Sequence, residues 1–138
     1  MRLLISDPTK IVVDDADVVS VRAEDASGCF GILQDHADLL TVLTPSVVAW
    51  RDSGGRMGWC AVRRGVLTVR GGNQVAIATR QAQLGDDLDE LEHAVVARFR
   101  ADADAERVAR VAATRLHMQA IRQIVRALRP GQQPEMAP

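Results

Sequence analysis

The chain has 138 residues, enough for one hydrophobic core and a small appended unit. Its hydrophobic fraction of 47% and charged fraction of 25% exclude wholesale disorder. A formal net charge of −1 indicates no general preference for a polyanionic partner, and two Trp, two Phe and no Tyr leave few rings on which nucleobases could stack.

Residues 2 to about 80 show the pattern of many short β-strands. Runs rich in Val, Ile, Leu and Thr are separated by Gly, Pro, Asn and Asp, which are typical of strand-ending turns. In "GVLTVRGG", Val66, Thr68 and Arg70 alternate with Leu67 and Val69, so one face is expected to be buried and the other solvated. The pattern predicts an antiparallel β-sandwich or flattened barrel over residues 1–85.

The same two-residue period occurs in "VSVRAE", where Val19, Val21 and Ala23 alternate with polar residues. The start of the chain, "MRLLISDPTK", does not have the pattern of a signal peptide, and no apolar run approaches the roughly 18 residues that would span a bilayer. Cys29 and Cys60 lack the spacing of a zinc site, and we expect two buried, reduced thiols.

The pattern changes to helical at "LGDDLDELEH". Leu88, Leu91, Val95 and Phe99 recur at three- and four-residue steps, and Asp86 is the expected N-cap. The segment "ADADAE" interrupts this stripe at residues 101–106, which predicts a turn. A second helix is expected from about residue 105 to 128, along the apolar repeat Val108, Ala112, Leu116, Ala120, Ile124 and Leu128. The predicted domains are the β-sandwich (1–85), a helical hairpin (86–129) and a disordered tail (130–138).

Charge is sorted between the two expected helices. The first helix and the turn are acidic, whereas the second carries Arg107, Arg110, Arg115, Arg122, Arg126 and Arg129. One interpretation is a solvated face complemented by the acidic neighbouring helix. The other is a cationic helix that docks on an acidic surface elsewhere.

The order of these motifs resembles the epsilon subunit of the rotary F-type ATP synthases. The family pattern "GxFGILPGHAPLLTxLxPG" has its counterpart in "GCFGILQDHADLLTVLTPS", and "GGxLEVxxNxVTVLA" in "RRGVLTVRGGNQVAIAT". The resemblance extends through about residue 90. Gln34 and Asp35 replace the family's Pro-Gly, and Asp38 replaces its second Pro. The segment "DASGCFGIL" also suggests the variant, alternate ion-translocating ATPases.

The resemblance implies a non-catalytic central-stalk subunit that couples proton or sodium transport to ATP synthesis or hydrolysis. Its implied partners are the gamma subunit, the c-ring and, transiently, the alpha/beta catalytic head. It implies a place on the cytoplasmic face of the bacterial inner membrane, with membrane contact only through the complex. No surplus apolar stripe demands a dimer, so a monomer is expected in isolation. The implied rotor-interface candidates are Phe30, Gln34, Asp35, His36, Asp38 and Leu39, and the arginine-rich helix is the candidate regulatory element.

Some members of the family bind ATP through a motif resembling "[IL]DxxRA". Asp89 aligns with the motif's Asp, but Glu92 replaces its Arg. Because a carboxylate there repels a polyphosphate, we expect no ATP binding, or only very weak binding, at that position. No other cofactor and no metal is expected.

Two hypotheses from other classes were also weighed. An enzyme built around Asp35, His36 and Asp38 would need a histidine oriented by a carboxylate beside a nucleophile or metal. A small nucleic-acid-binding or adaptor module would use the arginine-rich helix for phosphate contacts. The acidic first helix and the near-neutral charge disfavour nucleic acid.

Overall fold

The computed structural model describes residues 1–128, which separate into two compact units. The first unit, Met1–Ala101, holds every strand and the beginning of the helical region. The second unit begins at Asp102 and is helical as far as Leu128. Each unit is considered separately.

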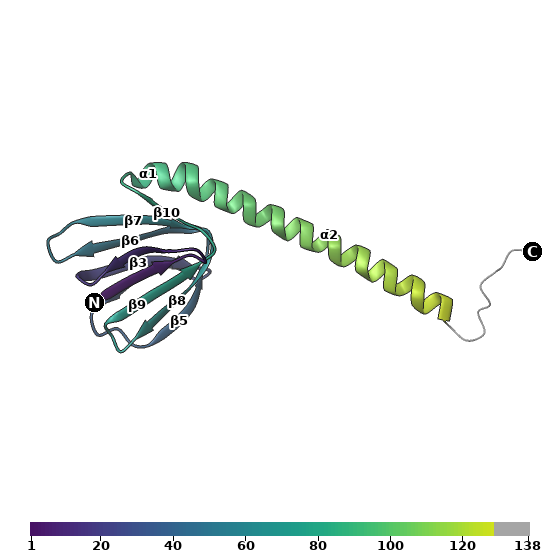
Figure 1. Ribbon diagram of the computed structural model, residues 1–138, viewed down its shortest axis with the longest axis horizontal. Helices are drawn as coiled ribbons and strands as arrows, with labels where there is room; N and C mark the ends of the chain where they lie inside the picture. The colour runs from purple at the N-terminus through teal and green to yellow at the C-terminus, as the bar shows by residue number, and fades with distance from the viewer. Residues whose placement is uncertain (129–138) are drawn as a thin grey trace, which may run out of the picture. The chain divides into compact units, whose positions relative to one another are not determined.

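The strands of the first unit belong to one ten-stranded sheet that folds over into a sandwich (Figure 1). They are β1 (Arg2–Ser6), β2 (Ile11–Asp15), β3 (Val18–Asp25), β4 (Gly28–Leu33), β5 (Leu39–Leu43), β6 (Ser46–Asp52), β7 (Met57–Val62), β8 (Gly65–Arg70), β9 (Gln74–Thr79) and β10 (Ala82–Gly85). The order is β10-β7-β6-β3-β5-β8-β9-β1-β2, with β4 paired to β3. Among the strands of residues 1–128, only the β1–β9 pair is parallel. The predicted β-sandwich is therefore confirmed.

The sheet turns its corner between β3 and β5. These strands share the single pair Asp25–Leu43, so β10-β7-β6-β3-β4 forms one layer and β5-β8-β9-β1-β2 the other. The Asp25 carboxylate closes the corner by accepting hydrogen bonds from the Ser27 hydroxyl (2.5 Å) and the Thr41 hydroxyl (2.7 Å). These bonds, that from Ser27 first, lower the pKa of Asp25 because they favour its ionised form.

The core lies between the two layers and follows the predicted period of two. Leu67 and Val69 of β8 are buried, whereas Val66 on the opposite face is 41% exposed. In β3 the period fails at one place: Val18 and Val21 are both buried and Val19 is exposed. The register with β6 shifts between Val18 and Ser20, and this bulge turns Val19 outward, contrary to the prediction.

The helical region begins one residue later than expected. Asp87, not Asp86, is the N-cap, and its carboxylate accepts the backbone N–H of Asp89 at 3.0 Å. The region comprises α1 (Leu88–Glu90), a π-helical segment η1 (Leu91–Val96) and α2 (Ala97–Leu128). No described helix combines the length and apolarity needed to cross a membrane.

The first helical turns pack on the outer face of β6 and β7. A second hydrophobic cluster joins Leu91, Val95, Val96 and Phe99 to Ala61, with the half-buried Val47 and Trp59 beside it. Three of these positions, Leu91, Val95 and Phe99, belong to the predicted stripe, but Val96 does not. The wider π-helical turn accounts for the addition, because it brings residues five apart onto one side.

The predicted turn at residues 101–106 is wrong, because this segment lies inside α2. The buried apolar stripe ends at Phe99, which is the last buried residue of the described helix. The helix itself continues to Leu128. "ADADAE" contains neither Gly nor Pro, and Ala is the strongest helix former. An ion pair between Asp104 and Arg107 at 3.2 Å further supports the helix. One long helix thus replaces the expected hairpin; Arg129 and the tail at 130–138 lie outside the described residues.

Candidate interaction surfaces

The loop after β4 is held backbone to backbone against the turn between β8 and β9. The N–H of Asp35 donates to the carbonyl of Gly72 at 2.8 Å, and the N–H of His36 donates to Leu33 at 3.2 Å. Asp35 has a positive φ of 64°, and Gly72 has a φ of 71°. A Cβ on Gly72 would lie 2.7 Å from the Asp35 Cα, so the approach requires glycine.

Asp38 completes this junction with its side chain. Its carboxylate accepts the N–H of Gly71 at 2.9 Å, which links β5 to the neighbouring turn. A proline at this position has no side-chain acceptor, so the aspartate supplies a connection that the family's usual residue cannot. The charge at position 38 therefore has a structural partner.

The ring of His36 bonds to the backbone beside it. Its Nδ1 lies 2.6 Å from the carbonyl of Ala37, so Nδ1 carries the proton and donates. Within residues 1–128 no carboxylate hydrogen bonds to this ring, and no cluster of three His, Cys, Asp or Glu side chains could hold a metal. The geometry does not provide the Asp–His pair that the enzyme hypothesis needs.

The six rotor-interface candidates fall into two groups. Phe30 and Leu39 are half-buried and pack against the main core, so they help hold the loop in place. Gln34, Asp35 and Asp38 are exposed, and His36 is half-buried between them. We refer to these last four residues as the β4–β5 loop surface.

A second surface, not recognised from the sequence, covers the outer face of β5 and β8. Leu40 is 70% exposed and Val42 47% exposed, and they lie directly opposite Thr68 and Val66. The same rows continue through Ala76 and Ala78 of β9 to Leu4 of β1. We call this set the β5–β8 face. The sequence does contain a signal for this face, because the outward-facing positions of β5 and β8 carry apolar residues. The two-residue period, however, predicts only that these positions are exposed to solvent.

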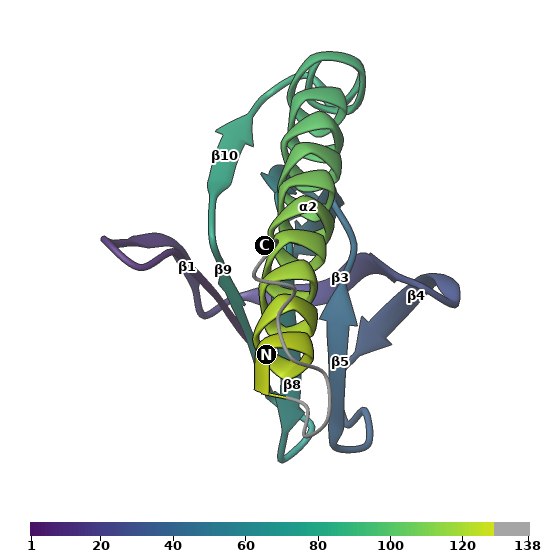
Figure 2. The same cartoon turned by 90° about the vertical axis from the view of Figure 1, so that its right-hand side faces the viewer.

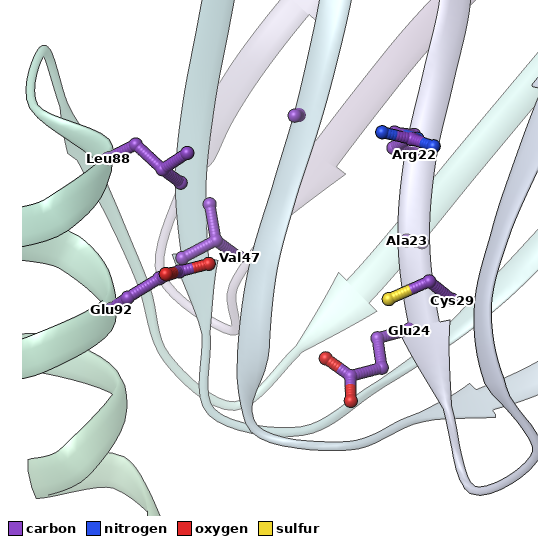
Figure 3. A pocket seen from close by; sticks show the side chains of 8 residues that line it. Arg22, Ala23, Glu24, Cys29, Val47, Leu88 and Glu92 are labelled. Atoms are coloured by element: carbon purple, nitrogen blue, oxygen red, sulfur yellow. The ribbon is translucent and has the colours of Figure 1, made fainter.

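A pocket of about 270 Å³ lies between the start of the helical region and the outer face of β3 (Figure 3). Its lining residues are Arg22, Ala23, Glu24, Cys29, Val47, Ala49, Leu88 and Glu92. Figure 3 shows the carboxylates of Glu24 and Glu92 on the two sides of this pocket. Asp89, the other residue of the ATP-like motif, uses its carbonyl to accept from Nδ1 of His93 at 2.8 Å. A polyphosphate at this position would meet two carboxylates.

The cysteines differ from each other. Cys60 is buried, and burial raises the pKa of its thiol to about 11. Cys29 is free and exposed, contrary to the expectation of two buried thiols. It lies on β4 where alternate residues face outward.

The helix of the second unit is basic, and its part from Arg115 to Leu128 is amphipathic. Arg107, Arg110, Arg115, Arg122 and Arg126 are exposed, and no acidic residue occurs between Arg107 and Leu128. At about 100° per residue, Arg115, Arg122 and Arg126 lie on one side and Ile121, Ile124, Val125 and Leu128 on the other. These four apolar side chains are 46–75% exposed.

Comparisons with known proteins give one consistent result. Residues 1–85 match the family described as "ATP synthase, Delta/Epsilon chain, beta-sandwich domain". The chain is 49% identical over 131 residues to ATP synthase epsilon chain 2 of Paraburkholderia xenovorans, covering 95% of this chain and 94% of the relative. It is 41% identical over 128 residues to ATP synthase epsilon chain 2 of Cereibacter sphaeroides, covering 93% and 88%.

Two solved structures share the fold. In the Euglena gracilis mitochondrial ATP synthase, one chain matches with a TM-score of 0.58 and 20% identity, over 67% of this chain and 59% of that chain. In the Tetrahymena thermophila mitochondrial ATP synthase central stalk and c-ring structure, the TM-score is 0.53 at 18% identity, over 75% and 90%.

Proposed function

Because the chain belongs to the epsilon-chain family of the F-type ATP synthases, we propose that it is a non-catalytic subunit of the central stalk. The nearly full-length match to two bacterial epsilon chains carries this proposal. In this role the subunit couples proton or sodium movement through the c-ring to ATP synthesis or hydrolysis. It works at the cytoplasmic face of the bacterial inner membrane and reaches the membrane through the complex.

We infer that the β5–β8 face binds the gamma subunit. Contiguous apolar side chains on the outside of a folded domain are typical of a protein interface. Leu40, Val42 and Val66 lie next to each other there, flanked by the small residues Ala76 and Ala78, so the face is open to a close partner.

The β4–β5 loop surface is our candidate for the c-ring contact. Its backbone is fixed by Gly72 and its far end by the Asp38–Gly71 hydrogen bond, so Gln34 and His36 are presented by a rigid loop. A rigid loop loses little conformational entropy on binding, which suits a contact that must bear torque.

The helix of the second unit is our candidate regulatory element. Its arginines and exposed apolar residues suit an apolar groove with an acidic rim, and we place that groove on the alpha/beta catalytic head. A second copy of the helix would bring arginine against arginine over residues 107–128, which disfavours self-pairing. We propose that docking of this helix restrains ATP hydrolysis. The pocket beside Glu24 and Glu92 is not an ATP site in this proposal.

Two variants test these assignments. Leu40→Asp together with Val66→Asp places charge on the β5–β8 face without touching the core, and we expect loss of co-purification with gamma. Arg56→Glu makes the same net charge change at an exposed side chain on the β6–β7 turn; it is the matched control and should bind normally. If the double variant binds gamma as the wild type does, the assignment of this face is wrong.

Truncation after Ala101 tests the regulatory part. It removes the second unit and keeps the cluster around Phe99, so the β-sandwich and its helical anchor stay intact. We expect this variant to bind the catalytic complex and to raise its ATPase activity. Unchanged activity would reject regulation by the helix but leave the coupling role in place.

A further inference from the structure

The outer face of the β4-β3-β6-β7 layer carries a groove that none of the roles above uses. Its volume is about 440 Å³, and it lies entirely within the first unit. Its lining residues are Ser20, Val21, Arg22, Gly31, Ile32, Leu33, Arg51 and Met57. β3 and β4 run side by side at this part of the sandwich (Figure 2).

Strand register explains the shape of the groove. One row across the layer reads Leu33, Ser20, Arg51, Met57. The next row reads Gly31, Arg22, Ala49, Trp59. Leu33 is 64% exposed and Met57 47% exposed, so two large apolar side chains stand at opposite ends of a row whose middle positions are Ser20 and Arg51.

Gly31 is not required by the backbone. Its φ is not positive, and a Cβ there would have its nearest neighbour, the carbonyl oxygen of Val21, at 3.9 Å. Glycine inside a strand lowers stability, and it often marks a place where a partner approaches closely. The effect of this glycine is to leave the hollow open beside Arg22.

The two arginines give the groove its charge. Arg22 and Arg51 are exposed and occupy diagonal positions on neighbouring strands, which places them about 7–8 Å apart. Neither guanidinium has a hydrogen bond or ion pair with any residue in the part of the chain that the structure describes, although both backbones are paired within the sheet. At the hairpin end, Asp17 accepts from the Ser53 hydroxyl and Asp52 from the N–H of Arg56. Glu24 and Glu92 line the neighbouring pocket, which Arg22 also borders.

We propose that this groove binds an acidic amphipathic helix of a partner protein. Two carboxylates one helical turn apart would meet Arg22 and Arg51, because side chains at i and i+4 are separated by about 5–6 Å. An apolar side chain at i+3 would enter the hollow above Gly31, beside Leu33. Two cations around an apolar hollow are too few for a nucleic-acid backbone, and there is no aromatic side chain in the lining for a base to stack on.

The test uses the full chain labelled with ¹⁵N and a synthetic helical peptide as the probe. The peptide carries Glu at i and i+4 and Leu at i+3 on an Ala/Gln background, and a matched peptide has Lys in place of Glu. We expect the Glu peptide to shift the amide signals of Ser20, Gly31 and Leu33, and the Lys peptide to leave them unchanged.

Three variants separate charge, shape and non-specific effects. Arg22→Ala with Arg51→Ala should lower the affinity for the Glu peptide about fivefold to tenfold, as expected for the loss of two exposed ion pairs. Gly31→Leu fills the hollow and should also lower the affinity for the Glu peptide about tenfold. The urea midpoint of unfolding should stay unchanged or rise. Lys10→Ala with Arg70→Ala removes the same two positive charges outside the groove and should bind as the wild type does.

The proposal is overturned if the Lys peptide binds equally well, or if millimolar Glu peptide shifts none of these signals. It is also overturned if the shifts map to the β5–β8 face, or if the arginine and Gly31 variants bind like the wild type. Since the probe is a free peptide, these outcomes do not depend on binding to gamma.

Discussion

The junction between the β4–β5 loop and the β8–β9 turn can be tested with two glycine substitutions. Gly72→Ala introduces a Cβ at a φ of 71° and 2.7 Å from the Asp35 Cα. Gly55→Ala introduces a Cβ at a φ of 82°, where nothing lies within 4 Å. Both variants force alanine into the left-handed region, but only the first collides with another backbone segment.

The expected costs follow from this difference. A left-handed alanine costs about 1 kcal/mol, which is the whole effect expected at Gly55. At Gly72 the loop must also move away, and overpacking of this kind adds about 1–3 kcal/mol. Gly72→Ala should therefore lower the free energy of unfolding by about 2–4 kcal/mol, within the stability of an ordinary domain.

Urea denaturation followed by tryptophan fluorescence measures both variants, because Trp50 lies in the core of the sandwich. With an m-value of about 1–2 kcal/mol/M, a difference of about 2 kcal/mol separates the two midpoints by about 1–2 M. Equal midpoints would show that the β4–β5 loop can move away from the new Cβ without lowering the free energy of unfolding. The description of the β4–β5 loop surface as rigid would then be refuted.

Three further predictions concern the corner, the helical anchor and the thiols. The hydroxyl donors to Asp25 lower its pKa, so their contribution is present above the unfolded pKa of about 4 and lost as pH falls through the folded value. The stability difference between wild type and Asp25→Asn, measured in urea, should shrink below pH 4; a constant difference would contradict this. Phe99→Ala should destabilise the helical turns that pack on β6 and β7 by about 3–5 kcal/mol. Amide hydrogen exchange should then become fast in residues 91–99 while the amides of the β-sandwich stay protected. Protection equal to wild type would argue against the anchor. A disulfide reagent at pH 8 should titrate one thiol per native chain, Cys29, and two in denaturant, because Cys60 is buried with a pKa of about 11; two fast thiols in the native chain would refute the burial.

The sequence was most informative where one physical rule dominates. In β8 the alternation of Leu67 and Val69 with Val66 follows from the pleat of a half-buried strand. The structure shows this alternation, with Leu67 and Val69 buried and Val66 exposed. At Val19 the rule fails because a bulge depends on the pairing partner, which a strand's own residues do not reveal. The turn expected at residues 101–106 failed because the end of an apolar stripe marks the end of packing, not of the helix.

The surfaces were harder to predict than the strands. Asp38 drew attention as a charge, but its hydrogen bond to Gly71 spans 33 residues and depends on how two loops meet in space. Val96 joins the buried cluster only because η1 is a π-helical segment, which periodicity of 3.6 does not anticipate. The β5–β8 face was missed because exposed apolar residues on a strand have the same pattern whether or not a partner covers them.

The most direct measurement is affinity purification of the tagged full chain from detergent-solubilised membranes of its own host. As a central-stalk subunit, the chain should co-purify with gamma, the c-ring and the alpha/beta head, and ATPase activity should migrate with it on a native gel. The Leu40→Asp, Val66→Asp variant should lose these partners, whereas Arg56→Glu should keep them. Recovery of the wild-type chain without gamma or ATPase activity would contradict the account.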